Sequence, residues 1–193
     1  MFEMTNRRLI RVIFGALLTG MLLTLAYPAS AQRTISGQST FAFSAHYTGS
    51  FVGAEAFYSQ YTLGGFWETG ATVSPYRYRL FSGDMLGNWH ISAAVGYLWR
   101  LAASRSRSFN WYAGAGIFAG IEWQDPFGKL PDYIDIGVAD IRFLYGIYAK
   151  TALEIFLGPR VALLVQGAAP VNFSSFCDNV HWQAGLGIKF MLN

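Results

Sequence analysis

The sequence predicts an all-β protein, an eight-stranded antiparallel transmembrane β-barrel of outer-membrane type preceded by a signal peptide. Three observations lead to this prediction. The chain of 193 residues is 53% hydrophobic, only 13% charged, and contains 21 glycines. Apolar side chains alternate with small or polar ones along most of the chain, and a period of two is typical of strands. The alternating segments number eight, and bacterial outer-membrane barrels have an even number of strands.

The composition excludes several other classes of protein. Intrinsic disorder requires low hydrophobicity and a high net charge, and this chain has neither. The single cysteine, Cys177, excludes a disulfide-stapled mini-protein. The net charge is +3, but Arg7, Arg8 and Arg11 all lie within the first eleven residues. No basic surface for a nucleic acid is expected beyond that segment.

Residues 1–31 have the three parts of a secretory signal peptide. A segment with three arginines precedes the uncharged apolar stretch Val12–Tyr27, and Ala29 and Ala31 are small residues at the positions that signal peptidase reads. We expect cleavage after Ala31 and a β-barrel domain over residues 32–193. The alternative is an uncleaved membrane anchor, but the apolar stretch of about 16 residues is shorter than the roughly 20 that a spanning helix needs.

Alternation is strictest in Val180–Leu192 and Trp111–Trp123. In the second segment, Gly114, Gly116 and Gly120 lie on the face opposite the large apolar side chains. Each of them would cost a helix on the order of 1 kcal/mol relative to alanine. On the inner wall of a narrow barrel, small residues instead leave room for side chains from the other strands. Both segments are therefore expected to be strands.

The remaining strands show the same pattern. They are Ser39–Tyr47, Phe51–Tyr58, Phe66–Val73, Trp89–Leu101, Phe143–Ile155 and Arg160–Phe173. A closed barrel satisfies every backbone polar group within lipid. The runner-up is a soluble secreted β-sandwich or lipocalin-like barrel, whose outer face should be rich in lysine, glutamate and threonine. Here tryptophan, tyrosine and phenylalanine occupy one face along its whole length, which favours the membrane barrel.

The lengths of the connections support this topology. With a periplasmic N-terminus, the compact gaps are the periplasmic turns Gln60–Gly65, Ala102–Ser108 and Gly158–Pro159. The outer loops are then Thr48–Ser50, Ser74–Asn88, Gln124–Arg142 and Ser174–Asn179. Two of these outer loops are the longest gaps in the chain, as expected when periplasmic turns are short and external loops are long.

The lumen of an eight-stranded barrel is just wide enough to be filled by side chains. The alternation places seven charged residues inside: Glu55, Glu68, Arg100, Glu122, Lys150, Glu154 and Lys189. Buried charges are costly unless they are paired and hydrogen-bonded, so we expect ion pairs that plug the barrel. One expected pair is Lys150 with Glu154. The alternative is a pathway for protons or ions.

No residue is singled out as catalytic, cofactor-binding or metal-binding. The three histidines are His46, His90 and His181, and none lies in a G-x-S-x-G elbow. His90 and His181 are expected to point into the lumen, away from any lipid substrate. Metal-ligand spacings are also absent from the sequence. We expect no enzymatic activity and no cofactor, with a lipid-modifying outer-membrane enzyme as the least favoured alternative.

Short motifs along the mature chain carry a family resemblance. They are Gln32-Arg33 and Gly37-Gln38 after the signal peptide, Gly96-Tyr97, Ala119-Gly120-Ile121-Glu122, and Gly185-Leu186-Gly187-Ile188-Lys189-Phe190. In these motifs and in the eight-strand pattern, the chain resembles the conjugative-transposon protein TraO family of the Bacteroidetes. The resemblance implies a non-enzymatic outer-membrane component of a conjugative DNA-transfer apparatus. Its expected partners are outer-membrane lipid and other apparatus subunits, with no direct binding of nucleic acid.

Composition supports a second function class equally well. This is a general small barrel of the OmpA or OmpX type, acting in adhesion, surface protection or envelope integrity. For the conjugation role, the best candidate contact segment is Gln124–Ala139, which combines Phe127 and Tyr133 with several acids. Exposed apolar groups rimmed by charge are typical of contact patches. The alternative for this segment is an ordinary outer loop over the mouth of the barrel.

Overall fold

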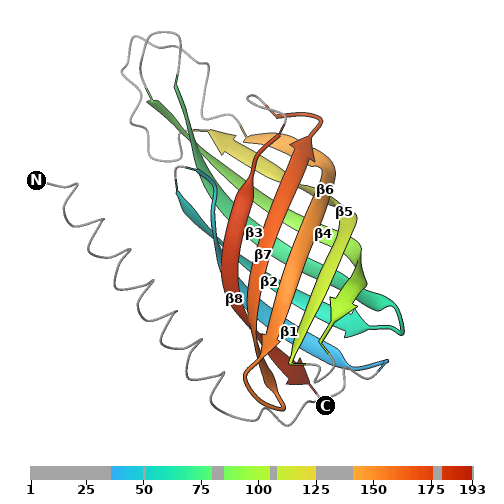
Figure 1. The fold of residues 1–193 in the computed structure, drawn as a ribbon. Helices are drawn as coiled ribbons and strands as arrows, with labels where there is room; N and C mark the ends of the chain where they lie inside the picture. Colours follow the sequence, from blue (N-terminus) through green and yellow to red (C-terminus); the bar gives the residue numbers. More distant parts are fainter. Residues whose placement is uncertain are drawn as a thin grey trace, which may run out of the picture.

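The computed structural model describes residues 36–49, 51–79, 85–104, 108–124, 141–175 and 180–192. These residues form eight strands: β1 (Ser39–Tyr47), β2 (Val52–Tyr61), β3 (Gly65–Arg79), β4 (Met85–Ala103), β5 (Phe109–Gln124), β6 (Ile141–Phe156), β7 (Val161–Asn172) and β8 (Gln183–Leu192). Each strand pairs antiparallel with the next, and β8 pairs with β1 to close the barrel (Figure 1). The predicted eight-stranded antiparallel β-barrel is confirmed. Within the described ranges, no helix has the length and apolar character needed to cross a membrane.

The two faces of the barrel wall follow the predicted alternation. In β6, Leu144 and Tyr148 are buried in the lumen, whereas Phe143 and Ile147 are exposed on the outside. Trp67 on β3 is likewise 55% exposed on the outer wall. An outer wall of aromatic and aliphatic side chains suits contact with hydrocarbon, because in water so much exposed apolar area would drive association.

The prediction of an outer loop over Ser74–Asn88 is wrong. The ladder between β3 and β4 continues to the pair Arg79 and Met85, so only residues 80–84 lie beyond it. Proline, serine and glycine in this segment read as turn signals, but Pro75 removes only one backbone donor. Its neighbours Ser74 and Tyr76 keep the inner-face alternation and are buried.

The predicted start of the last strand, Val180, is also wrong. Strand β8 begins at Gln183, and Val180 forms only an isolated bridge with Val171. Pro170 in β7 has no N–H to donate, so the ladder between β7 and β8 ends at Ala168. The Pro170 carbonyl still accepts a hydrogen bond of 3.2 Å from the backbone N–H of His181. Residues 180–182 therefore stay close to β7 without being part of the ladder.

The barrel has two distinct ends. The turns that follow β2, β4 and β6 lie at one end, here called the turn end, and the C-terminus of β8 also lies there (Figure 1). The connections that follow β1, β3, β5 and β7 lie at the opposite end, the loop end. The predicted signal peptide (residues 1–31), residues 125–139 of the candidate contact segment, and Cys177 all lie outside the described residues.

Candidate functional site

The lumen brings together six of the seven charged residues predicted to lie inside. Five of them, Glu68, Glu122, Lys150, Glu154 and Lys189, are buried, and Glu55 lines a cavity. Arg100 differs, because it lies at a register shift where β4 approaches the turn end. Its side chain is exposed, and its guanidinium Nη2 donates a hydrogen bond of 3.0 Å to the carbonyl of Leu63.

The layer of the lumen nearest the turn end is closed by an ion pair packed among aromatic rings. The Nζ atom of Lys189 lies 2.6 Å from Oε1 of Glu154, and the hydroxyl of Tyr61 donates to the same oxygen at 2.6 Å. The ammonium also lies 4.0 Å from the centre of the Phe66 ring, which in turn contacts Tyr112 edge-on with the ring centres 4.8 Å apart. All five residues are at most 2% exposed. This turn-end layer leaves no open passage.

A second layer lies in the middle of the lumen. The Nζ atom of Lys150 lies 3.2 Å from the Glu68 carboxylate and 3.7 Å from the centre of the Phe57 ring. The hydroxyl of Tyr148 donates to Glu68 at 3.1 Å. A Cβ at Gly96 would overlap the Tyr148 hydroxyl, so glycine at this position makes room for the tyrosine.

The expected pairing of Lys150 with Glu154 is wrong. Two inner-face residues four apart on one strand are separated by roughly 13 Å along it, which is too far for a direct ion pair. Each lysine instead reaches across the lumen. Lys150 on β6 pairs with Glu68 on β3, and Glu154 on β6 pairs with Lys189 on β8.

Glu55 has a different environment within the middle layer. Its Oε1 accepts a hydrogen bond of 2.7 Å from the hydroxyl of Ser44, which itself accepts one of 2.9 Å from the amide of Gln166. These three residues come from β2, β1 and β7, so the hydrogen bonds connect the two sides of the β1–β8 seam. The carboxylate of Glu55 thus accepts its hydrogen bond from a neutral hydroxyl.

The layer nearest the loop end is built around Glu122. Nε2 of His90 lies 3.1 Å from Oε1 of Glu122, and the amide of Asn88 and the hydroxyl of Ser175 donate to that same oxygen. The Tyr76 ring contacts both His90 and His181, at centroid distances of 4.4 and 4.7 Å. His90 and His181 therefore turn inward, as predicted.

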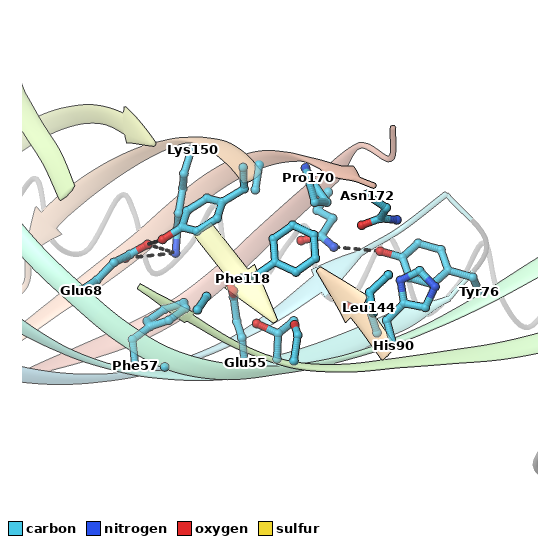
Figure 2. Close-up of a pocket in the computed structure, with 18 residues that line it drawn as sticks. Glu55, Phe57, Glu68, Tyr76, His90, Phe118, Leu144, Lys150, Pro170 and Asn172 are labelled. Carbon is cyan, nitrogen blue, oxygen red and sulfur yellow. Dashed lines mark hydrogen bonds and ion pairs between the residues drawn. The ribbon is translucent and has the colours of Figure 1, made fainter. Parts of the chain in front are cut away.

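A cavity of about 60 Å³ separates the middle and loop-end layers. In Figure 2, Lys150 and Glu68 lie at one end of it and Tyr76 and His90 at the other, with Phe118 between them. Since one water molecule occupies about 30 Å³ of liquid, a cavity of this size suits only a few of them. It is too small for a metabolite or a DNA strand.

The structure also reveals a serine and histidine pair that the sequence reasoning missed. Nε2 of His46 lies 2.7 Å from the hydroxyl of Ser74, and both residues are 2% exposed. In the Ser-His-Asp arrangement a third group orients the histidine, but Nδ1 of His46 has no hydrogen-bond partner in the described part of the chain. The pair was missed because Ser74 was assigned to a loop. Its place in the alternation with Tyr76 was the available signal.

The described residues contain no group of three histidine, cysteine or acidic side chains that could hold a metal ion. Lumen chemistry in these ranges consists of ion pairs, hydrogen bonds and ring contacts that link strands across the barrel. Such an arrangement stabilises a closed wall and holds side chains in place.

A family model described as conjugative transposon protein TraO matches residues 58–192. The chain belongs to the conjugative transposon protein TraO family. The match spans strands from the later part of β2 to β8, and it confirms the resemblance seen in the sequence motifs. No curated protein sequence matches the chain.

Solved structures similar to this TraO-family barrel include small outer-membrane barrels. The N-terminal β-barrel domain of Pseudomonas aeruginosa OprF aligns with a TM-score of 0.52 at 10% identity, covering 81% of this chain and 98% of that one. Neisserial surface protein A aligns with a TM-score of 0.49 at 13% identity over 79% of this chain and 94% of that one. Yersinia pestis Ail aligns with a TM-score of 0.46 at 14% identity over 82% and 100%. The OprF match supports the fold, and the family match ties this barrel to conjugative elements.

Proposed function

We propose that this TraO-family protein is a non-enzymatic outer-membrane component of a conjugative DNA-transfer apparatus, where it acts as a structural or docking subunit and not as a conduit. The observation that carries the proposal is the closed lumen of a conjugation-family barrel. The turn-end layer of Lys189, Glu154 and Tyr61 blocks the passage, and the remaining cavity of about 60 Å³ admits only water.

Opening the lumen for DNA would be costly. Separating Lys189 from Glu154 would leave two buried charges unpaired, and the effective penalty is several kcal/mol for each ion. The ladder between neighbouring strands also runs right around the barrel, so the wall cannot widen without losing backbone hydrogen bonds. The transferred strand would therefore pass through other subunits, with this barrel beside them.

The segment Gln124–Ala139 is the proposed contact with those subunits. It connects β5 to β6 at the loop end, and it combines apolar side chains such as Phe127, Leu130 and Tyr133 with acids. Rims of charge around apolar groups are common at protein contacts. Lipid covers the outer wall in this proposal, so protein partners bind at the ends of the barrel, and the composition of this segment favours the loop end.

A clean in-frame deletion of the gene tests the proposal. We expect transfer of the element to fall sharply while growth and outer-membrane permeability stay near wild type. Complementation with a version in which residues 126–138 are replaced by a short glycine-serine turn should restore a heat-modifiable barrel but not transfer. Ser74→Ala, which changes only the lumen, is the matched control and should restore both.

Two outcomes would contradict the proposal. Wild-type transfer from the deletion strain would reject the conjugation role. If that strain instead shows a defect in adhesion or permeability, the general OmpA or OmpX-like role is favoured. Wild-type transfer from the shortened-loop variant would reject Gln124–Ala139 as the contact while leaving the conjugation role intact.

The route to the outer membrane is part of the proposal. We propose export across the inner membrane, removal of residues 1–31, and insertion with both barrel termini facing the periplasm. Intact-mass measurement of the purified protein should give an N-terminus at Gln32. A membrane-impermeant thiol reagent should label Cys177 on intact cells, with the unfolded protein as the positive control. Failure to label Cys177 when that control labels would argue against this orientation.

A further inference from the structure

The outer wall is hollowed into a groove over β3, β4 and β5. The groove is shallow and open, and it is lined by residues of these three strands. Its sides are large side chains, Trp67, Tyr97, Trp99 and Ile117, and its floor includes Ala115. It faces away from the lumen, on the wall that we assign to lipid.

Small residues beside large ones create this groove. Ala115 pairs with Tyr97 on β4 and with Ala149 on β6. Ala115 forms part of the floor of the groove, and the Tyr97 ring borders it on the β4 side. The aromatic rings support one another instead of covering the alanine. Trp67 contacts Tyr97 edge-on with ring centres 5.0 Å apart, and Tyr97 contacts Trp99 in the same way at 5.2 Å. These ring contacts fix the shape of the groove.

The turn after β2, which Tyr97 of the groove contacts, is polar and carries a cation. The hydroxyl of Tyr97 lies 2.8 Å from that of Thr62 in the turn after β2. Arg100 on β4 donates two hydrogen bonds to the same turn. Its backbone N–H donates to the carbonyl of Gly64 at 2.8 Å, and its guanidinium donates to the carbonyl of Leu63 at 3.0 Å. The exposed guanidinium of Arg100 therefore lies at the same turn as the Tyr97 hydroxyl, at the turn end of the barrel.

We propose that this groove binds one anionic glycerophospholipid from the leaflet nearest the turn end, with an acyl chain against Ala115 and the phosphate paired with Arg100. Aromatic side chains and arginine are the usual anchors at the depth of lipid headgroups. A guanidinium has five N–H donors that match phosphate geometry, and the bond to Leu63 uses one of them. The combination of apolar groove and terminal cation matches an amphiphilic anion.

Native mass spectrometry of the mature barrel in detergent tests this inference. Dioleoylphosphatidylglycerol and dioleoylphosphatidylcholine have the same acyl chains but differ in net charge. We expect the wild-type barrel to retain the phosphatidylglycerol adduct at lower lipid concentration. Arg100→Gln should remove this preference. Arg160→Gln is the matched control, since Arg160 is exposed in the turn after β6 at the same end, and it should keep the preference.

Filling the groove tests its apolar part. Ala115→Leu should lower retention of both lipids, whereas Ala45→Leu, on the outer face of β1, should leave retention unchanged. Trp67→Leu lowers one wall of the groove and serves as a second variant if Ala115→Leu does not fold, which heat-dependent gel migration will show.

Three outcomes would overturn the inference. The first is an equal loss of the phosphatidylglycerol preference in Arg100→Gln and Arg160→Gln, which would indicate only a general attraction of anionic lipid to the turn end. The second is unchanged lipid retention in the folded groove variants. The third is a wild-type dimer that dissociates in Ala115→Leu, which would make a second copy of the chain the occupant. None of these readouts depends on DNA transfer, so they are independent of the proposed function.

Discussion

The two halves of the lumen bury charge in different ways. At the turn end, Lys189 and Glu154 are at most 1% exposed and are surrounded by Tyr61, Phe66 and Tyr112. Toward the loop end, Lys150 and Glu68 line a cavity that is large enough for a few water molecules. When one partner of an ion pair is removed, the remaining charge stays unpaired if no water can reach it. Beside a cavity that holds water, the remaining charge can be partly solvated. The turn-end layer therefore should tolerate substitution least.

The largest expected effect is at the turn-end pair. Glu154→Leu leaves the ammonium of Lys189 unpaired among aromatic rings, and we expect a loss of about 3 to 5 kcal/mol in the free energy of unfolding. Adding Lys189→Met should recover part of that loss, because the double variant has no unpaired charge. Denaturant unfolding of the refolded barrel in lipid vesicles measures both. Strict additivity of the two changes would contradict the pairing.

The second-largest loss of unfolding free energy is expected for a charge placed on the outer wall. Ile188→Arg places a charge on the lipid face of β8, where the expected loss is about 2 to 4 kcal/mol near the middle of the bilayer. Ile188→Leu is the control and should be nearly neutral. The same unfolding measurement compares them. An arginine tolerated as well as leucine would show that this face does not meet hydrocarbon.

A smaller effect is expected at the cavity-lining pair. Lys150→Met leaves Glu68 without its ammonium, but Tyr148 still donates to the carboxylate and water can enter the cavity. We expect a loss of roughly 1 to 3 kcal/mol. Glu68→Gln should recover part of it, whereas Glu154→Gln should not. A double-mutant cycle that couples Lys150 to Glu154 instead would contradict the geometry of the structure.

The smallest expected effect is at the serine and histidine pair. Ser74→Ala removes one hydrogen bond to His46, which should cost about 0.5 to 1.5 kcal/mol of unfolding free energy. Conjugative transfer should be unchanged, because we assign the pair no chemical role. Loss of transfer with a normally folded barrel would reveal a function for the serine beyond packing.

The side of the wall on which each residue lies could be predicted from local sequence. Strand backbone turns successive side chains to opposite faces, so Glu122, Glu154 and Lys189 were placed in the lumen from alternation alone. Arg100 follows the same alternation, yet its side chain is exposed, because it lies at a register shift near the turn end. The local sequence pattern does not reveal such a shift.

Partners across the lumen could not be predicted in the same way. Lys150 lies 82 residues from Glu68, and Lys189 lies 35 residues from Glu154. Which strands face one another across the interior depends on the stagger of the whole closed sheet, which the pattern of a single strand does not contain. Likewise, Ser74 and Tyr76 were assigned to a loop because turn-forming residues surround them, although the β3–β4 ladder continues through both.

The unequal lengths of the strands give the barrel a tall side and a short side. Strands β1 and β8, which meet at the seam, have 9 and 10 residues, close to the roughly 9 to 11 that cross a bilayer. On the other side, β4 has 19 residues and β5 and β6 have 16 each. At the loop end the β3–β4 ladder continues to the pair Arg79 and Met85, whereas the β1–β2 ladder ends at Tyr47 and Val52. The loop end of the barrel is therefore asymmetric, with its longest strands on the side away from the β1–β8 seam, even though the ladder is closed all round.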